Sequence, residues 1–282
     1  MSKPDSIQPI GKKKKAKILV YGIAGAGKTR LIGSTPGRTL IIRPATDHTT
    51  SIDKLAPGAS VDEWEVNNWS AMTECLDFCR FEAAKHYDWV WYDGISNGQD
   101  AGLDDVWADT IARKPERNKY GLDKSEYGIN MHRLGVWMRA FISMDQVNLG
   151  VTAHPYETTA GGGYETSKLD EGDSILMPWI QGKNMPMKIC GYMNGVFYLR
   201  VTKDSKTKKT IRELITDITP REFGATIYAK NQLFPGTKVI NPTMPDILAL
   251  INGSGRANMA SARRAGTRTA ARRPATRRAV KK

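Results

Sequence analysis

The chain has 282 residues, and 40% of them are hydrophobic, which is enough for one sizeable core with small appendages. The sequence contains no run of about 18 apolar residues, which argues against a membrane-spanning helix. The formal net charge of +13 favours a polyanionic partner over an acidic or apolar one.

The N-terminal region is polar and basic. Residues 1–16 predict a flexible lead-in that contains Lys12–Lys15, and Met1–Lys17 lacks the apolar stretch of a signal peptide. Cys75, Cys79 and Cys190 make an odd number of cysteines with no metal-ligand spacing, which is typical of reduced thiols. We therefore expect a cytoplasmic protein without disulfides or membrane contact.

The first strong motif is GxxxxGKT at residues 22–29, between an apolar strand at 18–21 and a helix that opens with Arg30. Strand, glycine loop and helix are the context in which this motif binds phosphate through backbone N–H groups and the helix N-terminus. Lys28 would reach the β- and γ-phosphates, and Thr29 would hold Mg²⁺. The motif predicts a nucleoside triphosphate and Mg²⁺ as ligands, bound by Gly22, Ile23, Ala24, Gly25, Ala26, Gly27, Lys28, Thr29 and Arg30.

Strands and helices then alternate along the chain. Apolar runs and helical periodicity predict strands at 39–42, 89–92 and 147–152, with helices at 69–84 and 124–144. This alternation predicts an α/β fold with a mostly parallel sheet and helices on both faces.

Two polar residues follow strands of this predicted sheet. Asp93 closes the strand at 89–92, where it would bind Mg²⁺ near the glycine loop or, alternatively, cap the following turn. His154 ends the strand at 147–152, where it would contact the γ-phosphate or, alternatively, bond to the backbone as a partly buried histidine.

Hydrolysis also needs an acid that positions water. Asp47, which follows the second strand, is the candidate by position, and Glu65 and Asp88 are candidates by residue type alone. A plain loop role for Asp47 remains an alternative. The candidate catalytic residues are thus Lys28, Asp93, Asp47 and His154.

The pattern changes after His154. Residues 157–172 are polar and contain three consecutive glycines, which predicts a long functional loop. Residues 195–202 and 210–216 predict a β-hairpin with a charged turn, and 242–251 a short last helix.

The C-terminal segment is strongly basic. Residues 256–282 hold ten Lys and Arg and no Asp or Glu, with almost no large apolar residues. This composition predicts a disordered tail at 253–282 that binds nucleic acid by neutralising phosphates. A solubility tail is the alternative.

Several segments together resemble one family. They are the glycine loop, the acid-terminated strand WVWYDGIS, the strand VNLGVTAH, Tyr228–Gln232 and Asn241–Thr243. They resemble the small phage-type RecA-like P-loop ATPases, which include AAA-type nucleotide-binding proteins and Sak-type single-strand annealing proteins. The resemblance spans roughly residues 15–252.

The resemblance implies a RecA-like ATPase domain at 17–252, ATP with Mg²⁺, assembly into rings or filaments, and a cytoplasmic location in the phage host. It matches Asp93 to the Walker B acid, His154 to the strand-end polar residue, and Lys230 to a basic residue that reaches a neighbour's nucleotide. The family has Arg two positions after that lysine, where this chain has Gln232, and Glu where this chain has Asp47.

The resulting hypothesis is a DNA-stimulated ATPase of phage recombination or replication. Single-stranded DNA would contact the loop at 157–172 and the tail at 256–282, and a replication or recombination protein would be a further partner. The alternative is an ATP-dependent loader or assembly partner with slow turnover.

Overall fold

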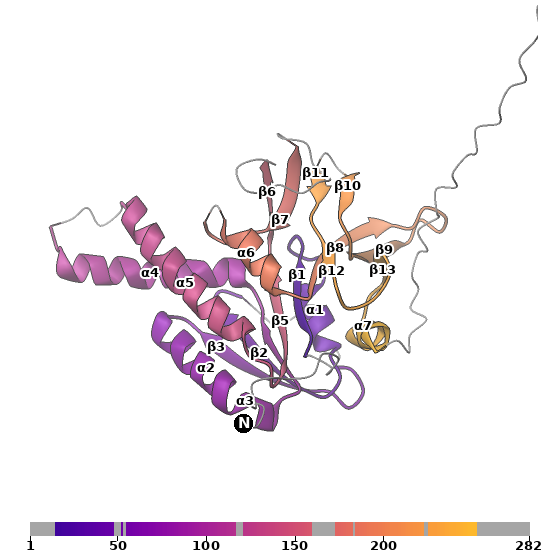
Figure 1. Cartoon of the computed structure of the whole chain (residues 1–282), viewed down its shortest axis with the longest axis horizontal. Helices are drawn as coiled ribbons and strands as arrows, with labels where there is room; N and C mark the ends of the chain where they lie inside the picture. Colours follow the sequence, from indigo (N-terminus) through magenta and orange to yellow (C-terminus); the bar gives the residue numbers. More distant parts are fainter. Residues whose placement is uncertain are drawn as a thin grey trace, which may run out of the picture.

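Figure 1 shows the computed structural model of the chain, which describes residues 15–47, 52, 55–116, 121–159, 173–182, 184–222 and 225–252. The predicted lead-in apart from its last two residues, residues 160–172 of the predicted loop, and the predicted tail at 253–282 lie outside the described residues. No described helix has both the length and the apolar character that crossing a bilayer requires.

The larger sheet has nine strands among the described residues, in the order β13-β9-β8-β1-β5-β4-β2-β3, with β12 paired to β8. Neighbours from β8 to β3 pair in parallel, whereas β9, β12 and β13 pair antiparallel. The prediction of a mostly parallel sheet followed by a hairpin is therefore confirmed. The strands are β1 (Lys17–Tyr21), β2 (Arg38–Pro44), β3 (Ser60–Val66), β4 (Trp89–Tyr92), β5 (Asn148–Ala153), β8 (Gly195–Lys203), β9 (Thr210–Ile215), β12 (Lys230–Asn231) and β13 (Lys238–Ile240).

Helices cover both faces of this sheet because its central strands are apolar on both sides. Leu19 and Tyr21 of β1 join a core with helices on one face, while Ile18 and Val20 join a second core on the other. The first face carries α2 (Trp69–Phe81), α3 (Ala83–His86), α5 (Lys124–Ile142) and α6 (Met185–Tyr192), and the second carries α1 (Lys28–Gly33) and α7 (Met244–Ile251).

A second, four-stranded sheet lies beyond the ends of β1 and β5, at the top of Figure 1. The Tyr21 hydroxyl ties it to β1 by donating to the carbonyl oxygens of Leu176 at 2.9 Å and Tyr228 at 2.6 Å. Its order is β10-β11-β7-β6, with β6 (Pro155–Thr159), β7 (Ser174–Pro178), β10 (Thr219–Glu222) and β11 (Ala225–Ile227).

Several sequence predictions were wrong in detail. The predicted loop at 157–172 begins inside β6, because residues 155–159 pair with β7. The predicted helix at 69–84 breaks after Phe81, where α3 begins. The sequence reading also missed the edge strand β3, whose side chains are mostly exposed, and the polar helix α4 (Ile95–Arg113), which has no strong apolar stripe.

Candidate nucleotide-binding site

The glycine loop joins β1 to α1 in the predicted arrangement. Gly25 and Gly27 have φ of 77° and 99°, in the left-handed region that favours glycine. The loop curls around the Lys28 ammonium, which donates to the carbonyl oxygens of Gly22 at 2.8 Å and Ile23 at 3.2 Å. Burial lowers the pKa of Lys28, although the carboxylates of Asp93 and Asp47 oppose that shift.

The loop forms one wall of a cavity of about 370 Å³. Residues from the ends of β2, β4 and β5 form the opposite walls, because parallel strands end at the same sheet edge. The cavity thus brings the four candidate catalytic residues together. It is lined by Ala24, Gly25, Gly27, Lys28, Thr29, Arg30, Asp47, Asp93, Gly94, Thr152, Ala153, His154 and Arg212.

Asp93 is buried at the carboxyl end of β4, directly opposite the loop threonine. Thr29 Oγ1 donates to Asp93 Oδ2 at 2.7 Å, and Thr152 Oγ1 donates to Oδ1. Burial raises the pKa of Asp93, while the hydrogen bonds from Thr152 and Thr29 partly offset that effect. Gly94, with φ of 93°, is the N-cap of α4, and no side chain caps this helix, so the turn-capping alternative for Asp93 is wrong.

Asp47 lies in the same cavity at the end of the turn that follows β2. Its Oδ1 accepts a hydrogen bond from Asn97 Nδ2, and a Cβ added to Gly94 would lie 1.8 Å from its Oδ2. Only a glycine at position 94 therefore leaves room for this carboxylate. Asp47 lines the cavity, and its role in positioning water stays a prediction.

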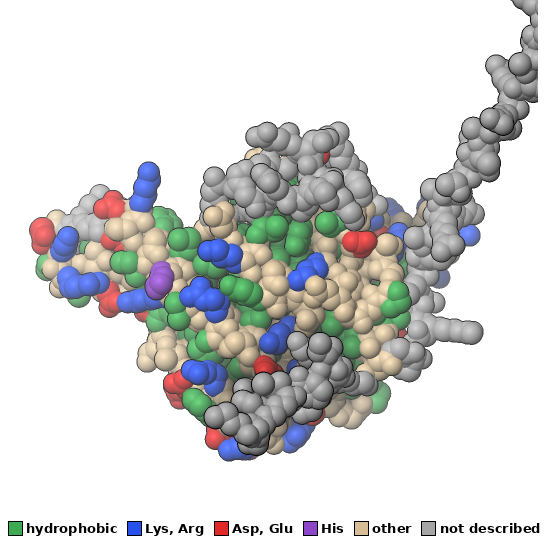
Figure 2. All heavy atoms as spheres, viewed as in Figure 1, with side chains coloured by type: hydrophobic (Ala, Val, Ile, Leu, Met, Phe, Trp, Pro, Cys, Tyr) green, Lys and Arg blue, Asp and Glu red, His purple; other side chains and the backbone are tan. Residues whose placement is uncertain are grey.

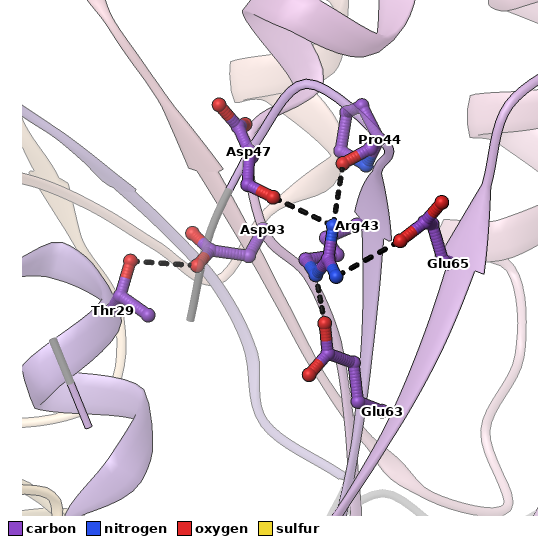
Figure 3. A network of polar contacts seen from close by, with 7 residues as sticks. All are labelled: Thr29, Arg43, Pro44, Asp47, Glu63, Glu65 and Asp93. Atoms are coloured by element: carbon purple, nitrogen blue, oxygen red, sulfur yellow. Dashed lines mark hydrogen bonds and ion pairs between the residues drawn. The ribbon is translucent and has the colours of Figure 1, made fainter. Parts of the chain in front are cut away.

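Arg43 holds the turn that carries Asp47 (Figure 3). Its guanidinium donates to the carbonyl oxygens of Pro44 at 3.2 Å and Asp47 at 2.6 Å, and it pairs with Glu63 and Glu65 of β3. Glu65 is thus engaged by Arg43 outside the cavity, and its candidacy as the water-positioning acid is not supported by its position.

Asp88 lies at the other edge of the sheet. It precedes β4, whereas Asp93 follows it, and its carboxylate accepts from the backbone N–H of Arg38 at 2.9 Å. A strand separates it from the cavity, so its geometry excludes contact with a ligand there.

His154 lies just after β5 beside the cavity, and its contact with the γ-phosphate stays a prediction. Its backbone N–H donates to Ser96 Oγ at 2.9 Å and its carbonyl accepts from the N–H of Trp179 at 2.7 Å, while its side chain lines the cavity. Burial lowers the pKa of His154, and the nearby Lys28 ammonium lowers it further. The imidazole is therefore neutral near pH 7.

Arg212 is a cavity residue that the sequence reading missed. It lies on β9, and its Nε donates to the Ala26 carbonyl oxygen at 3.1 Å, beside Gly27. No motif marks this residue, because the hairpin brings it to Ala26 of the loop from 186 positions away in the chain. Burial along β9 does not alternate around Arg212, so the strand pattern gives no signal for it either.

A smaller cavity of about 160 Å³ adjoins the first. Gly27, Arg30 and Arg212 line both cavities, so these residues form the wall between them. The other lining residues are Leu31, Ser34, Leu199, Asn241, Pro242 and Thr243.

Lys230 is not part of either cavity. It lies on β12, and its Nζ donates to the Gly191 carbonyl oxygen at 3.1 Å, next to the C-terminus of α6. A role toward the nucleotide of a neighbouring chain stays a prediction.

The cavity residues fit a polyphosphate with Mg²⁺. Three cationic side chains and the glycine loop face two carboxylates, Asp47 and Asp93. Among the described residues there is no group of three or more His, Cys, Asp or Glu that could hold a metal ion alone. That composition suits Mg²⁺, which usually binds through one or two protein ligands together with substrate phosphates and water.

No protein-family model matches this sequence, and no curated protein matches it. Among solved structures, the chain is similar to the X-ray structure of the Legionella pneumophila ATPase DotB, with 11% sequence identity and a TM-score of 0.30. The similarity covers 75% of this chain and 48% of the DotB chain, so this chain spans about half of that length.

Proposed function

We propose that this protein is a RecA-like P-loop ATPase that binds ATP with Mg²⁺ and couples its hydrolysis to single-stranded DNA in phage recombination or replication. The observation that carries the nucleotide part is the 2.7 Å hydrogen bond between Thr29 and Asp93. It joins the hydroxyl of the GKT motif to a buried strand-end carboxylate across a cavity with the loop on one side. Those are the positions that Mg²⁺ coordination in a P-loop requires.

The chain's cations would hold the phosphates. Lys28 would exchange its two bonds to loop carbonyls for bonds to the β- and γ-phosphates. Arg212 would neutralise developing negative charge from beside the loop, since its guanidinium already contacts the loop backbone. Thr29 and Asp93 would hold Mg²⁺, which would supply positive charge against the phosphates.

Two further cavity residues would act on the attacking water and the γ-phosphate. Asp47 would orient the water, with its carboxylate positioned by Asn97 and its turn held by Arg43. His154, neutral near pH 7, would donate or accept a single hydrogen bond at the γ-phosphate end of the cavity.

The nucleoside would occupy the smaller cavity. It begins where the loop cavity ends, at Gly27, Arg30 and Arg212, and it offers both apolar and polar contacts. Pro242 would pack against the base, and Asn241 would contact the ribose or base edge.

The nucleic-acid part of the proposal is supported by charge. The sequence holds ten Lys and Arg at 256–282, and a cationic arm binds phosphates with strong salt dependence. We propose that this tail and the loop at 157–172 contact DNA, and that the protein works as a ring or filament, with Lys230 near a neighbour's nucleotide.

The test is an ATPase assay with and without single-stranded DNA, run beside a size measurement in ATP. Wild-type protein should hydrolyse ATP faster with DNA, and Lys28→Ala should lower turnover on the order of 10²-fold or more. Lys114→Ala, at an exposed position after α4, is the matched control and should hydrolyse ATP normally. Normal hydrolysis by Lys28→Ala would overturn the proposal.

The second candidate is an ATP-dependent loader with slow turnover. The observation that favours it is the Asn97 bond to Asp47, which occupies part of the acid that would position water. Capture of a replication or recombination protein, together with ATP binding but no DNA stimulation of hydrolysis, would select this candidate.

A further inference from the structure

We propose that a basic surface formed by α5, α6, β1 and β12 binds single-stranded nucleic acid, with Tyr192 as a stacking platform. We call it the α5–α6 basic surface, and it consists of Lys17, Arg139, Lys188, Tyr192 and Lys230. The inference rests on the nucleic-acid part of the proposed function but names a site separate from the loop and the tail.

The residues of this surface converge although they come from distant parts of the chain. Lys17, Arg139 and Tyr192 line one cavity of about 310 Å³, together with Ile142 and Ser143. Lys188 lies one helical turn before Tyr192 on α6, so both side chains lie on the same side of that helix.

Lys230, on β12, is the remaining cation of this surface and lies next to α6. Its Nζ lies 3.1 Å from the carbonyl oxygen of Gly191, the residue before Tyr192. The lysine that the family resemblance singled out is therefore on this surface within its own chain.

The cations of this surface are mostly not neutralised by nearby carboxylates. Among the described residues, the ion pair at this surface is between Lys17 and Asp145, at 4.0 Å with an exposed aspartate. Figure 2 shows blue Lys and Arg side chains spread over the face formed by α5 and α6, with red side chains mainly toward its edges. A surface with excess positive charge attracts a polyanion.

Tyr192 adds a feature that a simple charged surface lacks. Its side chain is 44% exposed, although most aromatic side chains of the chain's two cores are buried. Exposed aromatic rings among cations are the combination that binds single strands, since bases stack on the rings while Lys and Arg follow the phosphates. This favours single-stranded nucleic acid over a duplex, whose bases are already stacked.

The position of the surface relative to the nucleotide site also has a consequence. Lys17 begins β1 and the glycine loop follows its end, so the two sites lie at opposite edges of the sheet. A nucleic-acid strand bound to this surface would leave the ATP cavity open, so the protein could hold both ligands at once.

The experiment measures binding of a labelled oligothymidylate to the full chain without nucleotide, over a series of salt concentrations. The double variant Arg139→Ala/Lys188→Ala should bind more weakly and lower the slope of log affinity against log salt by about 1.4, since each phosphate contact contributes about 0.7 for single strands. Tyr192→Ala should weaken binding by about tenfold with the slope unchanged, and Tyr192→Phe should restore it because the ring is retained.

The control is Lys114→Ala/Lys124→Ala, which removes the same charge at exposed positions near the far end of α5. Control binding close to wild type supports the proposal. Unchanged affinity and slope in Arg139→Ala/Lys188→Ala overturns the proposal, as does a wild-type affinity for Tyr192→Ala. It is also overturned if these variants lose self-association while their DNA binding stays intact. If the wild-type chain binds no oligothymidylate, the nucleic-acid part of the proposed function fails with it, whereas ATP hydrolysis is tested separately by Lys28→Ala.

Discussion

Asp93 carries a cost in the ligand-free fold that a purely structural residue would not. Its carboxylate is buried at the end of an apolar strand, and two threonine hydroxyls and the nearby Lys28 ammonium only partly compensate for the loss of water. A cation in the cavity would remove this cost, since opposite charge favours the ionised form. The residue is therefore adapted to a ligand more than to the stability of the free protein.

We predict that Asp93→Asn stabilises the nucleotide-free protein at pH 7 and abolishes stabilisation by Mg-ATP. Burial raises the pKa of Asp93, so its contribution to stability is present below the ordinary value near 3.8 and is lost as pH rises through the raised folded-state pKa. The neutral amide removes that loss. Thermal unfolding with and without Mg-ATP measures both effects, and Asp88→Asn, at the other end of β4, is the control.

His154 has the opposite pH dependence. Burial and Lys28 lower its pKa, so its contribution to stability is present above the ordinary value of 6.5 and is lost as pH falls through the lowered folded-state pKa. We predict that wild-type protein loses more stability than His154→Gln as the pH falls from neutral into this range. Denaturant titration at each pH measures the difference, with the exposed His132→Gln as control. Parallel curves for wild type and His154→Gln would contradict the prediction.

At the scale of elements, the site depends on an edge strand that contributes no cavity residue. β3 pairs with β2 in register, which places Glu63 and Glu65 beside Arg43. Arg43 in turn holds the backbone of the turn that ends at Asp47. The strand thus positions a catalytic candidate through one arginine, as Figure 3 shows.

We predict that Arg43→Gln destabilises the protein by about 1–2 kcal/mol, because two carboxylates and a turn carbonyl lose a shared donor but stay partly hydrated. It should also lower ATP turnover more than ATP affinity, because Asp47 would act on water and Lys28 on the phosphates. Arg38→Gln lies on the same strand but is paired with Asp88 at the other sheet edge, and it should change neither the stability nor the ATP turnover. Equal effects of the two variants on turnover would show that Arg43 does not position Asp47.

At the scale of the whole molecule, charge separates into regions. The ATP cavity balances cations with two carboxylates, whereas the α5–α6 basic surface and residues 256–282 are rich in cations. The larger sheet keeps the cavity and the basic surface at opposite edges. This separation would let ATP and nucleic acid bind without competing for the same cations.

We predict that deleting residues 256–282 weakens binding of single-stranded DNA and flattens its salt dependence. The segment holds ten cations, each of which contributes up to about 0.7 to the slope when it neutralises a phosphate. ATP hydrolysis without DNA should stay the same, because none of these residues belongs to the glycine loop or to the residues that line the cavity. Unchanged affinity and slope would favour the solubility role for the tail.

Local sequence patterns were enough to predict the glycine loop, the central strands and the two strand-end residues Asp93 and His154. These features depend on local patterns: a glycine motif of fixed spacing, and short apolar runs that end at a polar residue. The parallel arrangement followed from the alternation of strands and helices, because parallel strands need crossover connections.

The rest of the site depends on contacts that form when the chain folds. Arg212 reaches the loop through a hairpin, Thr152 shares Asp93 with Thr29, and Arg43 holds the turn of Asp47 through contacts with β3. None of these pairs has a fixed sequence spacing, because each depends on which strands are neighbours in the sheet. The physical reason is that strand order and register are set by the packing of both apolar faces, which local residue patterns do not encode.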